Sequence, residues 1–93
     1  MASKRKLKKT MHYISSELIT DVFFKTLISD KVNVAKADEL VMEIAEFTAE
    51  HIRRINHGGG GQNPKAVKDY FQKLYTDWNK GVEKLIEQVE KLK

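Results

Sequence analysis

The sequence predicts an all-α protein, an up-down-up three-helix bundle formed by a single domain over residues 1–93. Three observations support this fold class. Apolar residues recur at steps of three and four in three long segments, about residues 4–29, 34–57 and 64–92. A short polar connection and a glycine-rich loop, residues 58–63, separate the segments. No stretch alternates apolar and polar residues with the period of two that is typical of a half-buried strand.

The composition fits one small core and excludes several kinds of chemistry. An apolar share of 41% in 93 residues is enough for one domain. The absence of cysteine excludes disulfides, thiolate metal sites and cysteine nucleophiles, and it suits a reducing compartment. The basic start is not followed by the apolar core of a signal peptide, and no run approaches the roughly 20 apolar residues of a membrane span. We therefore expect a cytoplasmic protein.

The first segment carries one narrow apolar stripe, formed by Leu7, Met11, Ile14, Leu18 and Val22. Its second half is apolar on nearly all sides, which indicates a helix end that is covered all round. Two explanations stay open: the other two helices close over this end, or it faces a second subunit. The candidate interface residues are Ile19, Phe23, Phe24 and Leu27.

The second segment begins after Asn33, a residue type that caps helix N-termini. Its predicted core-facing seam is Ala37, Val41, Ile44, Thr48, His51 and Ile55, with Leu40, Phe47 and Ile52 on the flanks. Glu50 and Arg54 have the spacing and order of a favourable ion pair. Gly58 is placed to end the helix in a left-handed conformation.

The third segment begins with Asn63 as cap and Pro64 at the first helical position, where no backbone N–H is needed. The predicted seam is Phe71, Tyr75, Trp78, Val82, Leu85, Val89 and Leu92, with Val67 and Leu74 beside it. Gly81 interrupts the middle of this helix at a cost of about 1 kcal/mol relative to alanine. A closely approaching backbone or a bulky partner side chain would explain it.

Short connections make consecutive helices antiparallel neighbours. The alternative is a helical hairpin whose third helix pairs with another subunit. In the bundle, the starts of the first and third helices meet the end of the second. We name this end the basic pole, after its basic residues Lys4, Arg5, Lys6, Lys8, Lys9, Arg53, Arg54, Lys65 and Lys68.

The basic pole suggests contact with an anion or with nucleic-acid phosphates. However, few aromatic residues are interleaved with the lysines for base stacking, so a solubilising charged end explains them as well. The glycine run lacks the preceding strand and the Gly-Lys-Ser/Thr ending of a phosphate-binding P-loop. It is better explained as a flexible linker, with an anion site at the start of the third helix as the alternative. Membrane-surface binding by the first helix is a third reading, but its stripe fits a core face more simply.

His51 lies in a predicted apolar seam. Metal sites in helical bundles use Glu-x-x-His or similar spacings, and here Thr48 occupies the place of the glutamate and Ile55 that of a second histidine. We therefore expect His51 to be half-buried, with its ring hydrogen-bonded across the bundle. No nucleophile is spaced to meet an oriented base. The sequence predicts no catalytic residue, no metal and no cofactor.

The opening KRKLKK, residues 4–9, followed by His-Tyr-Ile-Ser-Ser-Glu-Leu, resembles the start of a group of short, uncharacterised bacterial proteins of about this length. The resemblance covers residues 4–18 best. It implies an all-helical fold and no known activity, and no functional residue is carried over from it.

The leading functional hypothesis is a non-catalytic protein-interaction or assembly module, with a homodimer as its simplest form. It depends on the surplus apolar surface of the first helix. The alternative is a nucleic-acid or polyanion binder that works through the basic pole.

Overall fold

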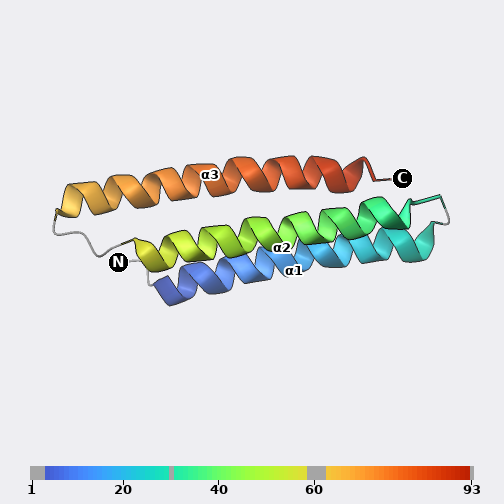
Figure 1. Cartoon of the computed structure of the whole chain (residues 1–93), viewed down its shortest axis with the longest axis horizontal. Coiled ribbons are helices and arrows are strands. Elements are labelled where there is room, and N and C mark those ends of the chain that lie inside the picture. Colours follow the sequence, from blue (N-terminus) through green and yellow to red (C-terminus); the bar gives the residue numbers. More distant parts are fainter. Residues whose placement is uncertain (1–3, 30, 59–62, 93) are drawn as a thin grey trace.

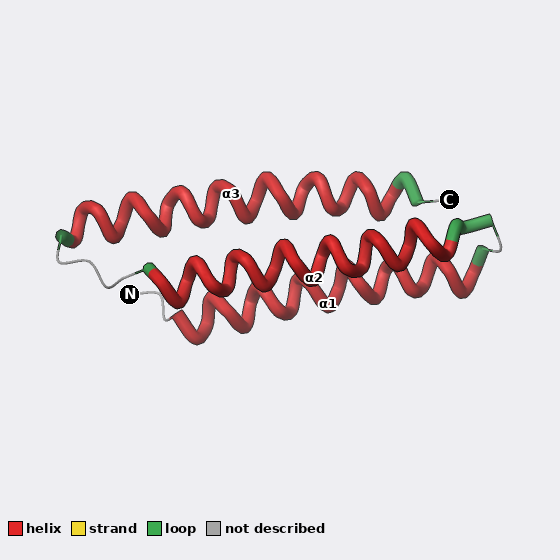
Figure 2. The backbone as a smooth tube through the Cα atoms, in the orientation of Figure 1, coloured by secondary structure: helices red, strands yellow, loops and turns green. Residues whose placement is uncertain are grey.

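The computed structural model describes residues 4–29, 31–58 and 63–92, which form three helices, α1 (Lys4–Ile28), α2 (Val34–His57) and α3 (Pro64–Glu90). The helices run up, down and up, so that α1 and α3 are parallel and α2 is antiparallel to both (Figure 1). Together they make a rod with extents of 54 × 19 × 17 Å (Figure 2). Within the described residues there is no strand. The predicted three-helix bundle is confirmed.

The helix starts follow from local capping chemistry. The Asn33 side-chain oxygen accepts hydrogen bonds from the backbone N–H groups of Ala35 and Lys36. Asn63 accepts in the same way from Lys65 at 3.0 Å, and Pro64 opens α3 as predicted. The helix ends are slightly earlier than predicted, because α1 stops at Ile28 and α3 at Glu90.

The core consists of two clusters along the rod. The one nearer the α1–α2 connection contains Leu18, Val22, Val32, Ala37, Leu40, Ile44, Leu85, Val89 and Leu92. The one nearer the basic pole contains Met11, Ile55, Leu74 and Trp78. Two predicted seam residues give way to their neighbours. Leu40 is buried where Val41 was expected, and Leu74 is buried while Tyr75 is exposed.

Gly81 forms a slot in α3 that the ring of Phe47 fills. A Cβ atom added at Gly81 would overlap that ring. The Phe47 ring also stacks on Trp78, with ring centroids 5.0 Å apart and planes 16° apart. The bulky partner side chain expected opposite Gly81 is therefore Phe47. Gly81 itself faces the core, and Val82, the predicted seam residue next to it, is partly buried against the core cluster nearer the basic pole.

Gly58 does not end α2 in a left-handed conformation, so that prediction is wrong. Its φ of −79° and ψ of 158° are extended and open to any residue. Glycine is needed at this position because there is no room for a side chain: an added Cβ would overlap the ring of Tyr70. The Tyr70 hydroxyl donates a hydrogen bond to the Arg54 carbonyl oxygen at 2.8 Å, which holds α3 against the end of α2. The rest of the glycine run, and with it the predicted linker, lies outside the described residues.

Candidate interaction surface

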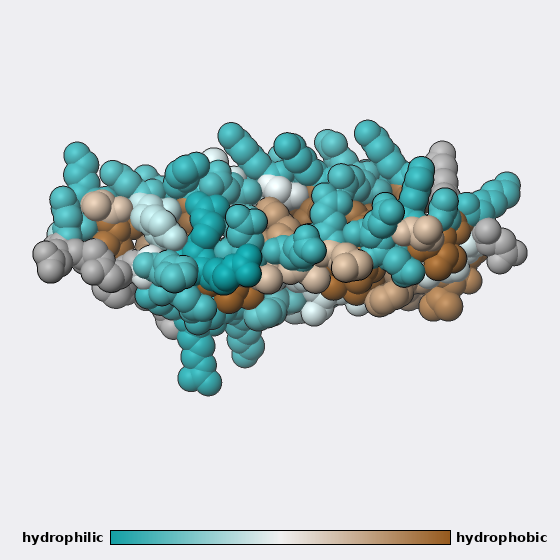
Figure 3. Space-filling model, viewed as in Figure 1, coloured by the Kyte–Doolittle hydropathy of each residue, from teal (hydrophilic) through white to brown (hydrophobic). Residues whose placement is uncertain are grey.

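Four large apolar side chains at the end of α1 are exposed. Phe23 and Phe24 are 51% and 60% exposed, and Leu27 and Ile28 are 82% and 73% exposed. We name this surface the apolar end of α1. Figure 3 shows apolar side chains gathered at the end of the molecule where α1 finishes. Exposed apolar clusters of this kind are uncommon on monomers and mark interaction sites.

The explanation in which α2 and α3 close over this end is wrong. Each helix of a three-helix bundle touches only two others, so one side of each faces outward. In α1 the buried side carries Met11, Ser15, Leu18 and Val22, whereas Phe23, Phe24 and Leu27 lie away from it. Of the predicted interface residues, only Ile19 is partly buried against the core. The other three form the exposed surface.

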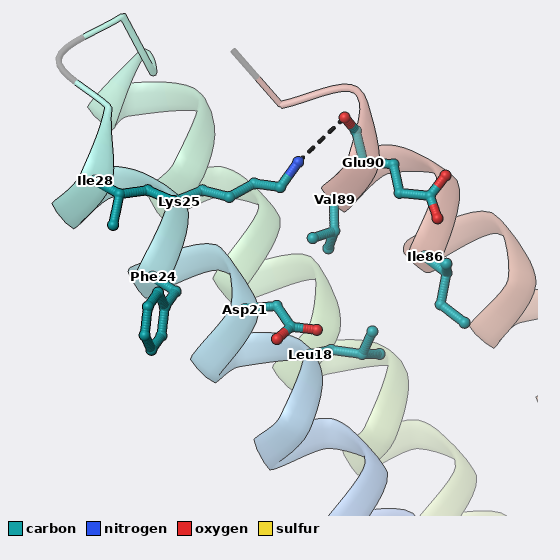
Figure 4. Close-up of a pocket in the computed structure, with 8 residues that line it drawn as sticks. All are labelled: Leu18, Asp21, Phe24, Lys25, Ile28, Ile86, Val89 and Glu90. Atoms are coloured by element: carbon teal, nitrogen blue, oxygen red, sulfur yellow. Dashed lines mark hydrogen bonds between the residues drawn. The ribbon is translucent and has the colours of Figure 1, made fainter.

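A groove between α1 and α3 lies beside the apolar end of α1. It has a volume of about 320 Å³, and its walls are formed by Leu18, Asp21, Phe24, Lys25, Ile28, Ile86, Val89 and Glu90. Leu18 and Asp21 extend from α1 toward α3, and the Lys25 ammonium reaches across to the Glu90 carbonyl oxygen at 3.1 Å (Figure 4). The groove thus combines an apolar floor with charges of both signs.

Two members of this surface were missing from the predicted interface. Ile28 belongs to the apolar end of α1. It lies in the segment that is apolar on nearly all sides, so the sequence pattern could have identified it as an interface residue. Ile86 of α3 is exposed and lines the groove. Ile86 lies beside the predicted seam of α3. The sequence of α3 alone does not show that α1 fails to cover this side of the helix.

The structure brings the predicted basic pole together at one end of the rod, where α1 and α3 start and α2 finishes (Figure 1). The Lys4 ammonium donates to the Gly58 carbonyl oxygen at 2.6 Å, which ties the start of α1 to the end of α2. The side chains of Arg5, Lys6, Lys9, Arg53, Lys65 and Lys68 are exposed, and that of Lys8 is half-buried.

Arg54, like Lys4, has a structural role within the basic pole. Its guanidinium forms an ion pair with Asp77 of α3 at 3.0 Å, instead of the predicted pair with Glu50. Lys73 lies 3.3 Å from the same carboxylate. Burial acts to raise the pKa of Asp77, but the hydrogen bonds from Arg54 and Lys73 and their positive charges outweigh it and lower the pKa. The ion pair therefore joins α2 to α3. It also neutralises one of the positive charges of the basic pole.

A second, shallow hollow lies on α1 within the basic pole. Its walls are formed by Lys6, Lys9, Thr10 and Tyr13. The Thr10 hydroxyl donates to the Lys6 carbonyl oxygen of its own helix at 3.0 Å. Two ammonium groups beside an exposed tyrosine ring are the residue types that contact phosphates and stack on bases.

His51 is buried, with 5% of its surface exposed, but its ring bonds within α2 and not across the bundle as predicted. Its Nδ1 donates to the Phe47 carbonyl oxygen at 2.8 Å, because a carbonyl can only accept. No described residue forms a hydrogen bond with Nε2. The ring packs 4.3 Å from Phe47 and 5.5 Å from Trp78, measured between centroids. His51 is thus a packing residue of an aromatic cluster.

Among the residues that the structure describes, no three His, Cys, Asp or Glu side chains come together as metal ligands. None of the described helices combines the length and the apolar character needed to cross a membrane.

Comparison of this chain with models of protein families, with curated proteins and with solved structures finds no match. The function of the chain is therefore inferred from the surfaces described above.

Proposed function

We propose that this chain is a non-catalytic assembly module, a cytoplasmic protein that binds a second copy of itself through the apolar end of α1. The observation that carries the proposal is the exposure of Phe23, Phe24, Leu27 and Ile28 on one helix end. Each apolar square ångström removed from water contributes roughly 25 cal/mol. Covering these four side chains is therefore favourable, and aromatic residues are the type enriched at interface centres.

The groove beside this surface supports self-association over the binding of a small molecule. It is a wide opening between two helices and is lined by both apolar and charged side chains. Binding sites for small molecules are usually more enclosed and bury most of the ligand. A protein surface can cover both the groove and the exposed aromatic rings at once.

We expect the wild-type chain to associate to a dimer in sedimentation velocity experiments as its concentration is raised. Phe24→Asp and Leu27→Asp place a charge on the surface to be buried, and each should shift the equilibrium to monomer by tenfold or more. Because both side chains are exposed in the single chain, the helical content and the thermal midpoint should change little.

Met42→Asp is the matched control, because Met42 is a comparably exposed apolar residue on α2, outside the apolar end of α1. It should leave dimerisation unchanged. A wild-type chain that stays monomeric at millimolar concentration would refute the proposed function. An equal loss of dimer in Met42→Asp and Phe24→Asp would show that the effect is not specific to this surface.

The hollow in the basic pole favours a second candidate function, the binding of nucleic acid or another polyanion. Generic duplex DNA and single-stranded RNA should bind at low salt, and the affinity should fall steeply as salt is added. Lys6→Gln with Lys9→Gln should weaken binding more than Lys80→Gln with Lys84→Gln, an exposed pair on α3 that removes the same charge. Equal weakening by the two pairs of substitutions would show that binding depends only on the net charge of the chain and not on the hollow.

A further inference from the structure

The groove between α1 and α3 is open in the described part of the chain. We infer that it receives the end of α1 from a second copy, which runs antiparallel to the first. This inference rests on the self-association proposed above and adds to it the position and the direction of the partner helix. Three features carry it: the direction of the helices, the spacing of the residues along the groove, and the charges on its walls.

The first feature is helix direction. α1 and α3 are parallel, and α2 runs against them (Figure 1). In an up-down-up-down bundle of four helices, the fourth helix packs against the first and the third and runs antiparallel to both. The α1–α3 groove is that fourth position. A helix that fills it in the usual packing therefore runs opposite to α1.

The second feature is spacing. Leu18 and Ile28 lie at equal distances on either side of residue 23, and so do Asp21 and Lys25. When two copies of α1 cross antiparallel level with residue 23, Ile28 of the second copy lies over Leu18, which is 7% exposed on the floor of the groove, and Asp21 faces the second copy's Lys25. In a two-fold dimer the same patch meets itself. Here that places apolar against apolar and acid against base.

The third feature is charge. No described residue pairs with the Asp21 carboxylate. The Lys25 ammonium gives one hydrogen bond to the Glu90 carbonyl oxygen and has two donors left. An antiparallel dimer joins these two groups twice, once on each side of its axis. A parallel dimer would set Asp21 against Asp21 and Lys25 against Lys25, and like charges in contact suppress an association.

Phe24 explains why the contact lies at this end of the rod. It follows residue 23 in the sequence and lines the groove, and its ring lies on the side of α1 that is turned away from α3 (Figure 4). A second copy seated on this end of α1 would cover the exposed ring of Phe24 together with the groove. Burial of an aromatic ring adds a large apolar area to an interface.

Charge exchange tests the pairing. Asp21→Lys and Lys25→Asp each create like-charge contacts, so each variant alone should dimerise about tenfold more weakly than wild type, or worse. An equimolar mixture of the two should recover dimers, because every contact is then between opposite charges. The double variant should dimerise like the wild type. Circular dichroism checks that Lys25→Asp, which also loses the bond to Glu90, remains folded.

Spin labels test the direction. The chain has no cysteine, so a single introduced cysteine labels one site. Lys9→Cys lies 14 residues from the crossing point, and at 1.5 Å per residue the two labels of an antiparallel dimer are separated by about 42 Å along the axis. In a parallel dimer the same labels should lie within about 20 Å, since packed helix axes are 8–10 Å apart. Thr20→Cys, close to the crossing point, gives a short distance in both.

The outcomes separate the two proposals. A dimer with a short distance between labels at position 9 would overturn the antiparallel inference and leave self-association standing. A dimer that keeps its wild-type affinity in both single charge variants would place the contact elsewhere on the chain and overturn the inference as well. A monomer at all concentrations would overturn both proposals. Recovery in the mixture, together with a distance near 42 Å at position 9, is the expected result.

Discussion

Trp78→Ala should lower the free energy of unfolding by about 3–5 kcal/mol, the usual cost of truncating a buried aromatic residue. Trp78 is buried in the core cluster nearer the basic pole and stacks on Phe47. Its loss removes ring contacts from Phe47 and His51 together. A domain of this size has a total stability of roughly 5–14 kcal/mol, so the variant should be close to unfolding. Urea denaturation followed by circular dichroism measures the change.

Tyr75→Ala is the control for this substitution, because the apolar pattern of α3 put Tyr75 in the same seam as Trp78. The structure leaves Tyr75 exposed and buries Leu74 instead. Tyr75→Ala should therefore cost well under half as much as Trp78→Ala, while Leu74→Ala should cost about 2–5 kcal/mol. If Tyr75→Ala proved as damaging as Leu74→Ala, the rotation of α3 in the bundle described here would be wrong.

Gly81→Ala should destabilise the bundle by about 1–3 kcal/mol, although alanine is the better helix former. The added methyl group would overlap the ring of Phe47. That ring cannot simply turn aside, because it is stacked on Trp78 and packed against His51. Thermal and chemical denaturation of the variant measure the loss.

The background Phe47→Leu should reverse the sign of this effect. Leucine is shorter than phenylalanine and leaves the slot at Gly81 free. In that background Gly81→Ala should stabilise the bundle by up to about 1 kcal/mol, the difference in helix propensity. A double-mutant cycle isolates the coupling between the two positions. The same cost in both backgrounds would mean that Phe47 does not occupy the slot.

Features that depend on a few neighbouring residues were predictable from the sequence. Asn33, Asn63 and Pro64 act at helix starts through their own side chains and the next backbone groups, and the structure confirms all three. The repeated spacing of apolar residues also predicted three helices of nearly the right length. These signals are local, so they do not depend on how the helices pack.

Features that depend on packing were predicted less well. Val41 and Leu40 are adjacent, as are Tyr75 and Leu74, and either member of each pair satisfies a spacing of three and four. The choice is made by the rotation of the whole helix, which the spacing alone does not determine. Gly58 was misread for a similar reason. Glycine is needed there by the ring of Tyr70, which arrives from another helix.

The candidate surface was recognised in part. The excess of apolar residues around Phe23 and Phe24 is visible in the sequence, because one helix face cannot hold them all. Whether they are covered by the same chain depends on how far α2 and α3 reach around α1. The two helices lie on one side of α1 only, so the excess remains exposed. The groove with Ile86 is a property of two helices together.

The odd number of helices leaves a backbone dipole that nothing within the bundle cancels. Each helix carries about half a positive charge at its N-terminus and half a negative charge at its C-terminus. Two N-termini and one C-terminus lie at the basic pole, where the Lys4 ammonium already occupies the C-terminal carbonyl of Gly58. The unbalanced helix therefore adds about half a positive charge to the end that is already basic. Antiparallel pairing of two copies would point these dipoles in opposite directions and make the assembly positive at both tips.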